Sequence, residues 1–386
     1  MQIKKILHIV TVPQTIIAFF RGQLEYMLEK KLEIHIITSY SKDFTHLELS
    51  YPQIHFHKVN IERKLTPVKD LLVLIKLSWL ISRINPDIIH LHTPKASLLG
   101  AVAARLLNRK NIIFQVHGLL SAQNGKIQFP IAYFEKLTFA LAHKCLAVSP
   151  SLRDLCIQSK LCPSNKISVI HNGTYNGVDS INVFNPDKFN SEFRSHKRSK
   201  YGIAPNDFVI GFIGRICKDK GISEFMQIAS QLIVKYPHLH FVVCGANELD
   251  SELAKHFENF IAVNNRIHYL GLQRDIAPIY AILNVLFLPT YREGLSQVAI
   301  EASAMKIPIV ASNIPGCKDA IDNDQNGILV PCYDISGYSS ALEKYINETS
   351  LALRHGEYGR QRVLRMYSPP DIWHKLYEKY YELLTN

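Results

Sequence analysis

Two cations lie close together in the segment GFIGRICKDKGISEF (211–225). The pattern predicts a strand that ends at Gly214 and a helix that begins near Gly221, so Arg215 and Lys220 occupy the turn between them. Backbone N–H groups at a helix start, together with two cations, can bind a diphosphate, and Gly214 lets a ligand approach the backbone closely. Cations on such a turn are also common as ordinary solvated residues.

Two carboxylates, Glu293 and Glu301, are separated by seven residues within FLPTYREGLSQVAIEASAMKIPIVA (287–311). Apolar runs at both ends of this segment predict buried parallel strands, joined by a polar loop and a helix with Ser296 as its N-cap. Both carboxylates then lie at the carboxyl edge of a sheet, where ligands bind in open α/β folds. Such a group can accept two hydrogen bonds from the vicinal diol of a ribose or hexose. Either glutamate alone is more often a plain surface or cap-like residue.

The elements that position these residues form two series of alternating strands and helices, which predict two doubly wound parallel sheets. The first series has strands at 3–10, 33–38, 56–59, 87–92, 111–117, 144–148 and 167–170, and helices at 18–30, 65–84, 96–107, 130–142 and 150–159. The alternation stops over 171–206, which is rich in Asn, Gly and Asp and is interpreted as a connection, and restarts at 208–213. The predicted domains are 1–190 and 191–368, with a C-terminal helix, 369–386, packing back on the first.

Composition agrees with a globular two-domain chain: 386 residues, of which 47% are hydrophobic and 20% charged. The seven cysteines are odd in number and form no C-x-x-C pair, which favours reduced thiols in a cytosolic protein over a zinc site or a disulfide framework. No stretch reaches about 18 uninterrupted apolar residues, so no transmembrane helix is predicted.

The charge is uneven along the chain. Residues 1–195 contain 24 Lys+Arg and 13 Asp+Glu, whereas residues 196–386 contain 20 of each. The basic excess indicates an anionic partner for the first half, such as a nucleic acid, an anionic membrane or a phosphorylated substrate; a merely basic surface is the alternative. The apolar helix 65–84 is more often a packed helix of this fold than a membrane anchor, although Lys64, Lys69, Lys76 and Arg83 accompany it.

The order of several segments resembles one family. GRICKDKG followed by YREGLSQVAIEA is similar to the retaining glycosyltransferases of family 4, and DIIHLHTPKASLLGA (87–101), FQVHGLLS (114–121), LAVSPSLRDL (146–155) and VIHNGTYNGVD (169–179) match further segments of that family in order. The resemblance implies the GT-B fold, with two Rossmann-like domains facing across a cleft. The first would hold the acceptor and the second the nucleotide sugar.

The resemblance also implies residue roles. Arg215 and Lys220 would hold the donor's diphosphate and neutralise the charge that develops as it leaves. Glu293 would bind the transferred sugar and His117 would approach that sugar, although His117 is otherwise an ordinary hydrogen-bonded strand-end histidine. The implied donor-binding residues are Glu301, Gly214, Gly294, Leu295, Ser296 and Asn172. No metal, cofactor or protein base is implied.

The loop after the first strand departs from the family. It reads TVPQTIIAFFRG, whereas many relatives carry a Gly-Gly pair there. Gln14, Thr15 and Arg21 are therefore only candidates for acceptor binding. Lys95, at a strand-to-helix turn, is a fourth candidate, and a solvated helix-start lysine is equally compatible with the sequence.

The predicted function is a retaining hexosyltransferase. It moves a hexose or N-acetylhexosamine from a nucleotide sugar, expected to be UDP-linked, to a lipid-diphosphate-linked glycan of a bacterial surface polysaccharide such as lipopolysaccharide or capsule. Its expected location is cytoplasmic, peripheral to the inner face of the cell membrane. The alternatives are a UDP-sugar epimerase of GT-B architecture and a non-catalytic nucleotide-sugar-binding module. A nucleic-acid partner is disfavoured because basic runs interleaved with aromatics are absent, and an NAD enzyme because no G-x-G-x-x-G follows Val10 or Ile213.

Overall fold

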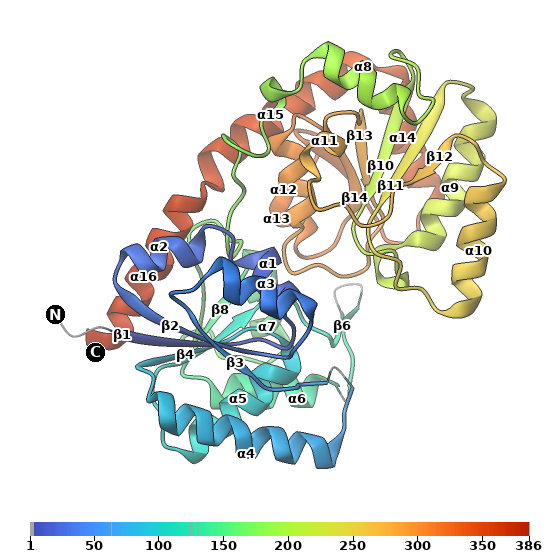
Figure 1. Cartoon of the computed structure of the whole chain (residues 1–386). Helices are drawn as coiled ribbons and strands as arrows, with labels where there is room; N and C mark the ends of the chain where they lie inside the picture. The colour runs from blue at the N-terminus through green and yellow to red at the C-terminus, as the bar shows by residue number, and fades with distance from the viewer. Residues whose placement is uncertain (1–3, 63, 124–125, 130, 386) are drawn as a thin grey trace. The chain divides into compact units, whose positions relative to one another are not determined.

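The computed structural model describes residues 4–62, 64–123, 126–129 and 131–385. These form two compact units, unit 1 (Met1–Gly177 and Pro369–Asn386) and unit 2 (Val178–Ser368) (Figure 1). The division falls after Gly177 rather than at residue 190, because the chain from Val178 onward packs into unit 2. The Val178 N–H donates to the Tyr367 carbonyl at 3.0 Å, and the Val178 side chain is buried in that core.

Unit 1 is built on a seven-stranded parallel sheet in the order β3-β2-β1-β4-β5-β8-β9. Almost all of its central strand residues are buried, because helices cover both faces of a doubly wound sheet. The strands are β1 (Lys4–Ile9), β2 (Leu32–Thr38), β3 (His55–Lys58), β4 (Ile88–Leu91), β5 (Ile112–Val116), β8 (Lys144–Ala147) and β9 (Ile167–Val169); β6 (Ala122–Gln123) and β7 (Lys126–Ile127) form a separate hairpin.

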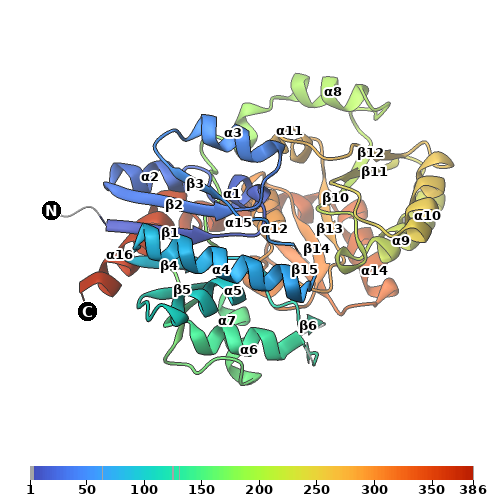
Figure 2. The same ribbon diagram turned by 60° about the horizontal axis from the view of Figure 1, so that its bottom comes forward.

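The helices of unit 1 lie on two sides of this sheet. On one side α4, α5 and α6 follow one another, with α5 contacting both neighbours (Figure 2). On the other side α16 packs on α2, and Trp373 of α16 donates from Nε1 to Asn176 Oδ1 at 2.7 Å. The helices are α1 (Pro13–Phe19), α2 (Gln23–Glu29), α3 (Lys42–Ser50), α4 (Pro67–Ile84), α5 (Pro94–Leu106), α6 (Ile131–Leu141), α7 (Pro150–Gln158) and α16 (Pro369–Thr385).

Two local predictions for the helices were wrong. The single helix predicted over 18–30 is two helices, α1 and α2, because the backbone enters the left-handed region at Gly22. The predicted connection 171–206 contains the helix α8 (Ser191–Ser199), whose Arg198 is buried. The Arg198 guanidinium donates to the carbonyls of Ile282, Pro205 and Asp207, which fixes this segment to unit 2.

Unit 2 contains a six-stranded parallel sheet in the order β12-β11-β10-β13-β14-β15. Its strands are β10 (Phe208–Ile213), β11 (Leu239–Cys244), β12 (Ile267–Tyr269), β13 (Val285–Leu288), β14 (Ile309–Ser312) and β15 (Gly327–Val330). Its other helices are α9 (Ile222–Lys235), α10 (Ser251–Ala262), α11 (Ala277–Tyr280), α12 (Gln297–Ala304), α13 (Cys317–Ala320), α14 (Ile335–Asn347) and α15 (Thr349–Met366), with 3-10 turns η1 (Pro186–Lys188) and η2 (Lys218–Lys220).

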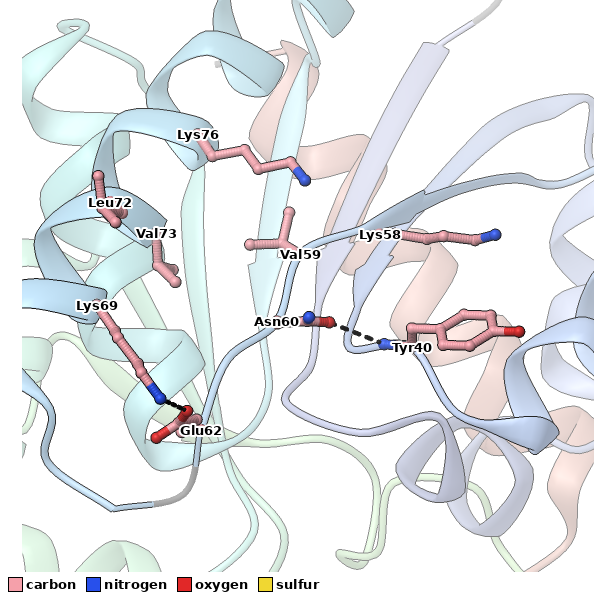
Figure 3. Close-up of a pocket in the computed structure, with 9 residues that line it drawn as sticks. All are labelled: Tyr40, Lys58, Val59, Asn60, Glu62, Lys69, Leu72, Val73 and Lys76. Atoms are coloured by element: carbon pink, nitrogen blue, oxygen red, sulfur yellow. Dashed lines mark hydrogen bonds and ion pairs between the residues drawn. The ribbon is translucent and has the colours of Figure 1, made fainter.

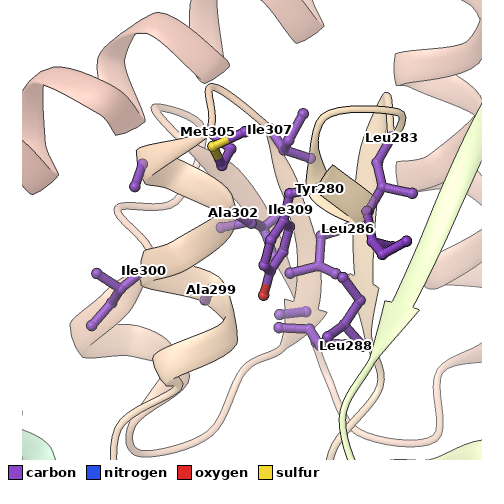
Figure 4. Close-up of a cluster of buried hydrophobic side chains, with 14 of the residues drawn as sticks. Tyr280, Leu283, Leu286, Leu288, Ala299, Ile300, Ala302, Met305, Ile307 and Ile309 are labelled. Atoms are coloured by element: carbon purple, nitrogen blue, oxygen red, sulfur yellow. The ribbon is translucent and has the colours of Figure 1, made fainter. Parts of the chain in front are cut away.

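Both faces of the unit 2 sheet are packed with apolar side chains. Along β13, Leu286 and Leu288 belong to the cluster beneath α12 (Figure 4), whereas Val285 and Phe287 belong to the opposite cluster beneath α9 and α14. This alternation is the period-two side-chain pattern of a strand, and burial of both faces explains why the strand is apolar without interruption.

Two chain-wide observations complete the fold. All seven cysteines are free thiols, and five of them are buried. Among the described residues, no helix is both long enough and apolar enough to cross a membrane.

Candidate active site

The cationic turn between β10 and α9 sits at the carboxyl edge of the unit 2 sheet, as the sequence predicted. Gly214 has no heavy atom within 4 Å of the position that a Cβ would take, so the space beside this backbone is open. Arg215 is 51% exposed in its side chain, and its Nη1 lies 2.6 Å from Glu248 Oε2. The ion pair with Glu248 therefore holds the guanidinium at the open edge of the sheet, where an anionic ligand could replace Glu248.

The structure brings Lys220 and Glu293 together, although they lie far apart in the sequence. The distance from Lys220 Nζ to Glu293 Oε1 is 2.5 Å, and their side chains are only 21% and 14% exposed. A partly buried ion pair is only weakly screened by solvent, so each charge strongly favours keeping an opposite charge nearby.

Backbone contacts create this pairing. Thr290 Oγ1 and the Tyr291 N–H both donate to the Asp219 carbonyl, at 3.1 and 2.9 Å, and Arg292 pairs with the Asp219 carboxylate. At Gly221, where φ is +75°, a Cβ would lie 2.0 Å from the Pro289 carbonyl oxygen. Glycine is thus required where the turn and the loop after β13 meet.

Glu301 lies in α12, where Tyr280 Oη donates to its Oε2 at 2.9 Å. Tyr280 itself is fully buried between α12 and the sheet (Figure 4). Burial raises the pKa of Glu301 to about 7, against hydrogen bonds from Tyr280 and Gln297 that lower it. Near neutral pH this carboxyl is therefore close to the midpoint of its titration, and a donor that binds its ionised form will be sensitive to pH.

The loop residues implied to bind the donor lie between Glu293 and α12. Gly294 and Ser296 are buried, while Leu295 is partly buried against the core beneath α12. Ser296 occupies the N-cap position, but its side chain makes no capping hydrogen bond, contrary to the usual behaviour of a serine cap. Its N–H instead donates to the Gly316 carbonyl at 3.3 Å, which links this loop to the next one.

In unit 1, His117 follows β5 directly. Its ring stacks on Phe19 with centroids 4.8 Å apart, and its Nε2 lies 3.3 Å from His92 Nδ1. Burial lowers the pKa of His117 to about 4, so the imidazole is neutral at physiological pH. It can therefore donate or accept one hydrogen bond, but it does not supply a positive charge.

Sequence reasoning missed the histidine layer behind His117. His8, His90 and His92 are 0–2% exposed, and His8 Nδ1 lies 3.0 Å from His92 Nε2. His90 Nδ1 is 2.6 Å from Tyr380 Oη of α16. The sequence feature that could have revealed this layer is the H-x-H spacing of His90, on β4, and His92, just after it. Alternate residues of an extended chain share one face. Among the described residues, potential metal-ligand atoms gather in threes at His8/His90/His92 and at Glu33/His35/His55, and neither group includes a residue of the donor site.

The acceptor candidates of unit 1 have different surroundings. Gln14 Nε2 donates to Asp43 Oδ2 at 2.5 Å, Thr15 is buried in α1, and Arg21 is exposed. Lys95 is not a solvated helix-start lysine. Its side chain is 10% exposed and its Nζ lies 2.6 Å from Asp70 Oδ1, which ties α5 to the start of α4. Asn172 lies in the turn after β9, where the Gly173 N–H donates to the Ile170 carbonyl at 2.9 Å.

Comparison with known proteins gives a consistent result across the chain. Residues 193–362 match the model of the family described as glycosyl transferases group 1, and residues 21–175 match that of glycosyltransferase family 4. The capsular polysaccharide biosynthesis glycosyltransferase CapM of Staphylococcus aureus is 32% identical over 98% of this chain and 97% of the relative.

Two further comparisons extend this match. A UDP-Gal:α-D-GlcNAc-diphosphoundecaprenol α-1,3-galactosyltransferase of Escherichia coli is 26% identical over 84% of this chain and 82% of its own length. The structure of Anabaena Alr3699/HepE with UDP and glucose superposes with a TM-score of 0.79, at 18% identity, over 97% of this chain and 99% of that one. The sheet orders, the whole-chain match and the fold agreement lead to one conclusion: this chain belongs to the family 4 glycosyltransferases and has their GT-B fold.

Proposed function

We propose that the chain transfers a hexose or N-acetylhexosamine, with retention, from a UDP-linked sugar to a lipid-diphosphate-linked glycan of a bacterial surface polysaccharide such as capsule or lipopolysaccharide. The observation that carries the proposal is the Lys220–Glu293 pair at the carboxyl edge of unit 2, beside Arg215 and the open space at Gly214. The name of CapM supports the capsular role, and that of the Escherichia coli relative supports a UDP donor and a lipid-diphosphate acceptor. HepE was crystallised with UDP.

In this proposal Lys220 and Arg215 change ion-pair partners when the donor binds. An incoming diphosphate attracts Lys220 and Arg215, whose partners in the free protein are Glu293 and Glu248. Once Lys220 turns to phosphate, Glu293 is free to accept hydrogen bonds from the hydroxyls of the sugar. Charge-assisted hydrogen bonds to phosphate and to the sugar hydroxyls then replace the ion pairs that are lost, so each of these charged groups keeps a partner when the donor is bound. Glu301 takes the ribose hydroxyls, and the backbone at Gly294, Leu295 and Ser296 lies along the phosphates.

The chemical step requires no protein base. The bond between the anomeric carbon and the diphosphate oxygen breaks, and its electron pair stays on the diphosphate. The acceptor hydroxyl attacks from the same face, and its proton passes to the departing phosphate oxygen. Arg215 and Lys220 stabilise the negative charge that develops, which is the role that a preorganised electrostatic site performs best. We assign no cofactor and no metal to this step.

Residues of unit 1 have roles of their own in this proposal. Neutral His117 hydrogen-bonds the transferred sugar, Asn172 contacts the donor, and the acceptor binds near Gln14, Thr15 and Arg21. Lys95 is a weaker candidate because Asp70 already neutralises it. A lipid-linked acceptor places the enzyme at the cytoplasmic face of the cell membrane as a peripheral protein.

Nucleotide binding tests the donor site. Calorimetry and thermal shift with UDP, GDP and ADP compare the wild type with Arg215→Ala/Lys220→Ala. We expect UDP to raise the melting temperature and the double variant to bind it roughly 10- to 100-fold more weakly, because two charge-assisted contacts are lost. The matched control is Lys235→Ala/Arg354→Ala, which removes two exposed ion pairs elsewhere in unit 2.

Three outcomes would contradict the proposal. Unchanged UDP affinity in the double variant would remove the diphosphate role of these cations. Interconversion of UDP-sugars without transfer to an acceptor would indicate an epimerase, and UDP binding without any turnover of a lipid-diphosphate acceptor would indicate a binding module. Release of UDP in equal amount to the glycan product is the expected result.

A further inference from the structure

Helix α4 is apolar on two faces, and only one of them is buried. Its inner face packs into unit 1 through Val73, Leu77, Leu80, Ile81 and Ile84. Its outer face presents a second stripe at helical spacing, exposed by 54–77%: Val68, Leu71, Leu72, Ile75 and Trp79. A helix that is apolar all round is normally covered on all sides, so the outer stripe requires a partner.

Exposed apolar side chains are also found on α6 and just before it. Ile131, Tyr133, Phe134 and Leu137 are 42–70% exposed, and Phe129, just before the helix, is 72% exposed. Helices α4, α5 and α6 follow one another on one side of the same sheet (Figure 2), so we consider the exposed apolar side chains of α4 and α6 together. We call this surface the α4–α6 face.

Basic side chains accompany this face. Lys64, Lys69, Lys76 and Arg83 are exposed along α4, and Lys136 is exposed on α6. Unit 1 as a whole contains 24 Lys+Arg and 13 Asp+Glu, whereas unit 2 contains 20 of each. A partner that covers the α4–α6 face must therefore be apolar where it meets the stripe and anionic around it.

A groove of about 620 Å³ adjoins the stripe, between α4 and the segments that follow β2 and β3 (Figure 3). Lys58, Lys69 and Lys76 line it, together with Leu72 and Val73 of α4. Glu62 Oε1 lies 2.5 Å from Lys69 Nζ and so neutralises that one lysine. The remaining lysines of the groove suit the phosphate of a lipid whose chains lie along the neighbouring stripe.

We propose that the α4–α6 face is the surface by which this protein docks on an anionic phospholipid bilayer. This proposal rests on the proposed function, since it names the surface that brings unit 1 to a lipid-linked acceptor. Helix α4 lies in the plane of the interface, with Leu71, Leu72, Ile75 and Trp79 among the acyl chains. The lysines contact lipid phosphates, because basic groups are attracted to the surface of an anionic membrane.

A second copy of the chain is the less suitable occupant. In a symmetric dimer the same patch meets itself, so the lysines of one α4 would face those of the other. Like charges that face each other in a desolvated interface disfavour association. An anionic bilayer satisfies the apolar stripe and the basic groups together.

Vesicle binding tests the docking face. Sedimentation of the wild type with phosphatidylglycerol/phosphatidylcholine vesicles is compared with pure phosphatidylcholine vesicles, and with the variant Leu72→Glu/Ile75→Glu. We expect the wild type to bind the anionic vesicles at least tenfold more tightly than the neutral ones, and the variant to lose at least tenfold. The matched control, Val234→Glu/Val263→Glu, alters two side chains of unit 2 that are 84% and 80% exposed, and should bind like the wild type.

Several results would overturn the docking face: no binding of the wild type to anionic vesicles, equal loss in the control, or a concentration-dependent dimer that the variant abolishes. Turnover of a short-chain, water-soluble acceptor separates this inference from the proposed function. The variant should keep that turnover and its UDP-induced thermal shift. Vesicle binding by a protein that transfers no sugar would refute the proposed function alone, whereas transfer without vesicle binding would refute the docking face alone.

Discussion

Units 1 and 2 are both parallel sheets between helices, yet they bury different chemistry. In unit 1 the imidazoles of His8, His90 and His92 are enclosed within the core. In unit 2 the central strands β10 and β13 carry only aliphatic, phenylalanine and glycine side chains. Charged groups of unit 2 instead gather at the carboxyl edge, where Lys220 meets Glu293. The same architecture thus supports a charged site at the carboxyl edge of one sheet and a layer of buried histidines against the other.

This difference separates two demands on the fold. A site for a diphosphate needs fixed charges, and backbone contacts across η2 and the 290–292 loop provide the necessary rigidity in unit 2. Unit 1 has a basic excess and the exposed α4–α6 face, which suit a large lipid-linked partner. The following predictions test this division, beginning with the largest expected effect.

Acid should unfold unit 1 before unit 2. Burial lowers the pKa of seven histidines in unit 1, to about 3 for His8 and to about 4 for His117, and of three in unit 2, namely His240, His268 and His355. Below pH 6.5 the unfolded chain binds protons that the native unit excludes, so stability present above pH 6.5 is lost as the pH falls toward these values. Both tryptophans, Trp79 and Trp373, lie in unit 1, so their fluorescence should change at a higher pH than hydrogen exchange in α9 and α12.

A variant tests the cause. His8→Leu should move the fluorescence midpoint to lower pH, because one buried group no longer has to be protonated. His46→Leu, which changes an exposed histidine of unit 1, should leave the midpoint in place. Unfolding of both units at the same pH in the wild type would contradict the prediction that unit 1 unfolds first.

Removal of the Glu293 carboxylate, which pairs with Lys220, should abolish most of the turnover. Glu293→Ala is expected to reduce kcat by roughly 10²- to 10³-fold, a typical cost of losing a preorganised polar contact, while UDP affinity stays within about threefold. Steady-state kinetics and calorimetry measure the two quantities. Glu343→Ala, which breaks an exposed ion pair with Lys235, is the control. Wild-type turnover of Glu293→Ala would exclude its contact with the sugar.

The contact between η2 and the loop after β13 should be intolerant of a single methyl group. Gly221→Ala introduces a Cβ 2.0 Å from the Pro289 carbonyl oxygen at φ +75° and should lower the stability of unit 2 by roughly 3 kcal/mol. Gly202→Ala is the control, since φ is +68° but nothing lies within 4 Å of its Cβ, and it should cost about 1 kcal/mol. Equal effects in chemical denaturation would show that strain alone, without the contact, sets the cost.

The smallest expected effect concerns Glu301. Its pKa of about 7 means that the ionised fraction rises roughly tenfold between pH 6 and pH 8. If the ionised form accepts the ribose hydroxyls, affinity for a UDP-sugar should rise by up to about tenfold over this range. Glu301→Gln should show a flat calorimetric profile. If the affinity of the wild type is equally independent of pH, the ionised Glu301 carboxylate does not bind the ribose hydroxyls.

The periodicity of the chain was sufficient to predict two doubly wound units, and the structure confirms that architecture. Alternation of buried strands with helices is a local property, so it is visible without tertiary contacts. The break at Gly22 and the helix α8 were missed. Packing decides both: a Cβ at Gly22 would lie 2.5 Å from the Trp373 ring, and Arg198 of α8 is held by carbonyls of unit 2.

The candidate site divides in the same way. The sequence identified the glycine-bordered turn and the spaced glutamates, because their types and spacing already indicate phosphate and diol chemistry. It did not indicate that Lys220 would pair with Glu293, that Asp70 would neutralise Lys95, or that His117 would end a buried histidine layer.

Sequence alone therefore determined most of the elements that form and the chemical groups at their ends. Tertiary structure decided which distant groups meet and how far water is excluded from them. The physical reason is that a charge's partner and its pKa depend on burial and on neighbours brought together by packing, as for His90 and Tyr380, which lie 290 residues apart in the chain.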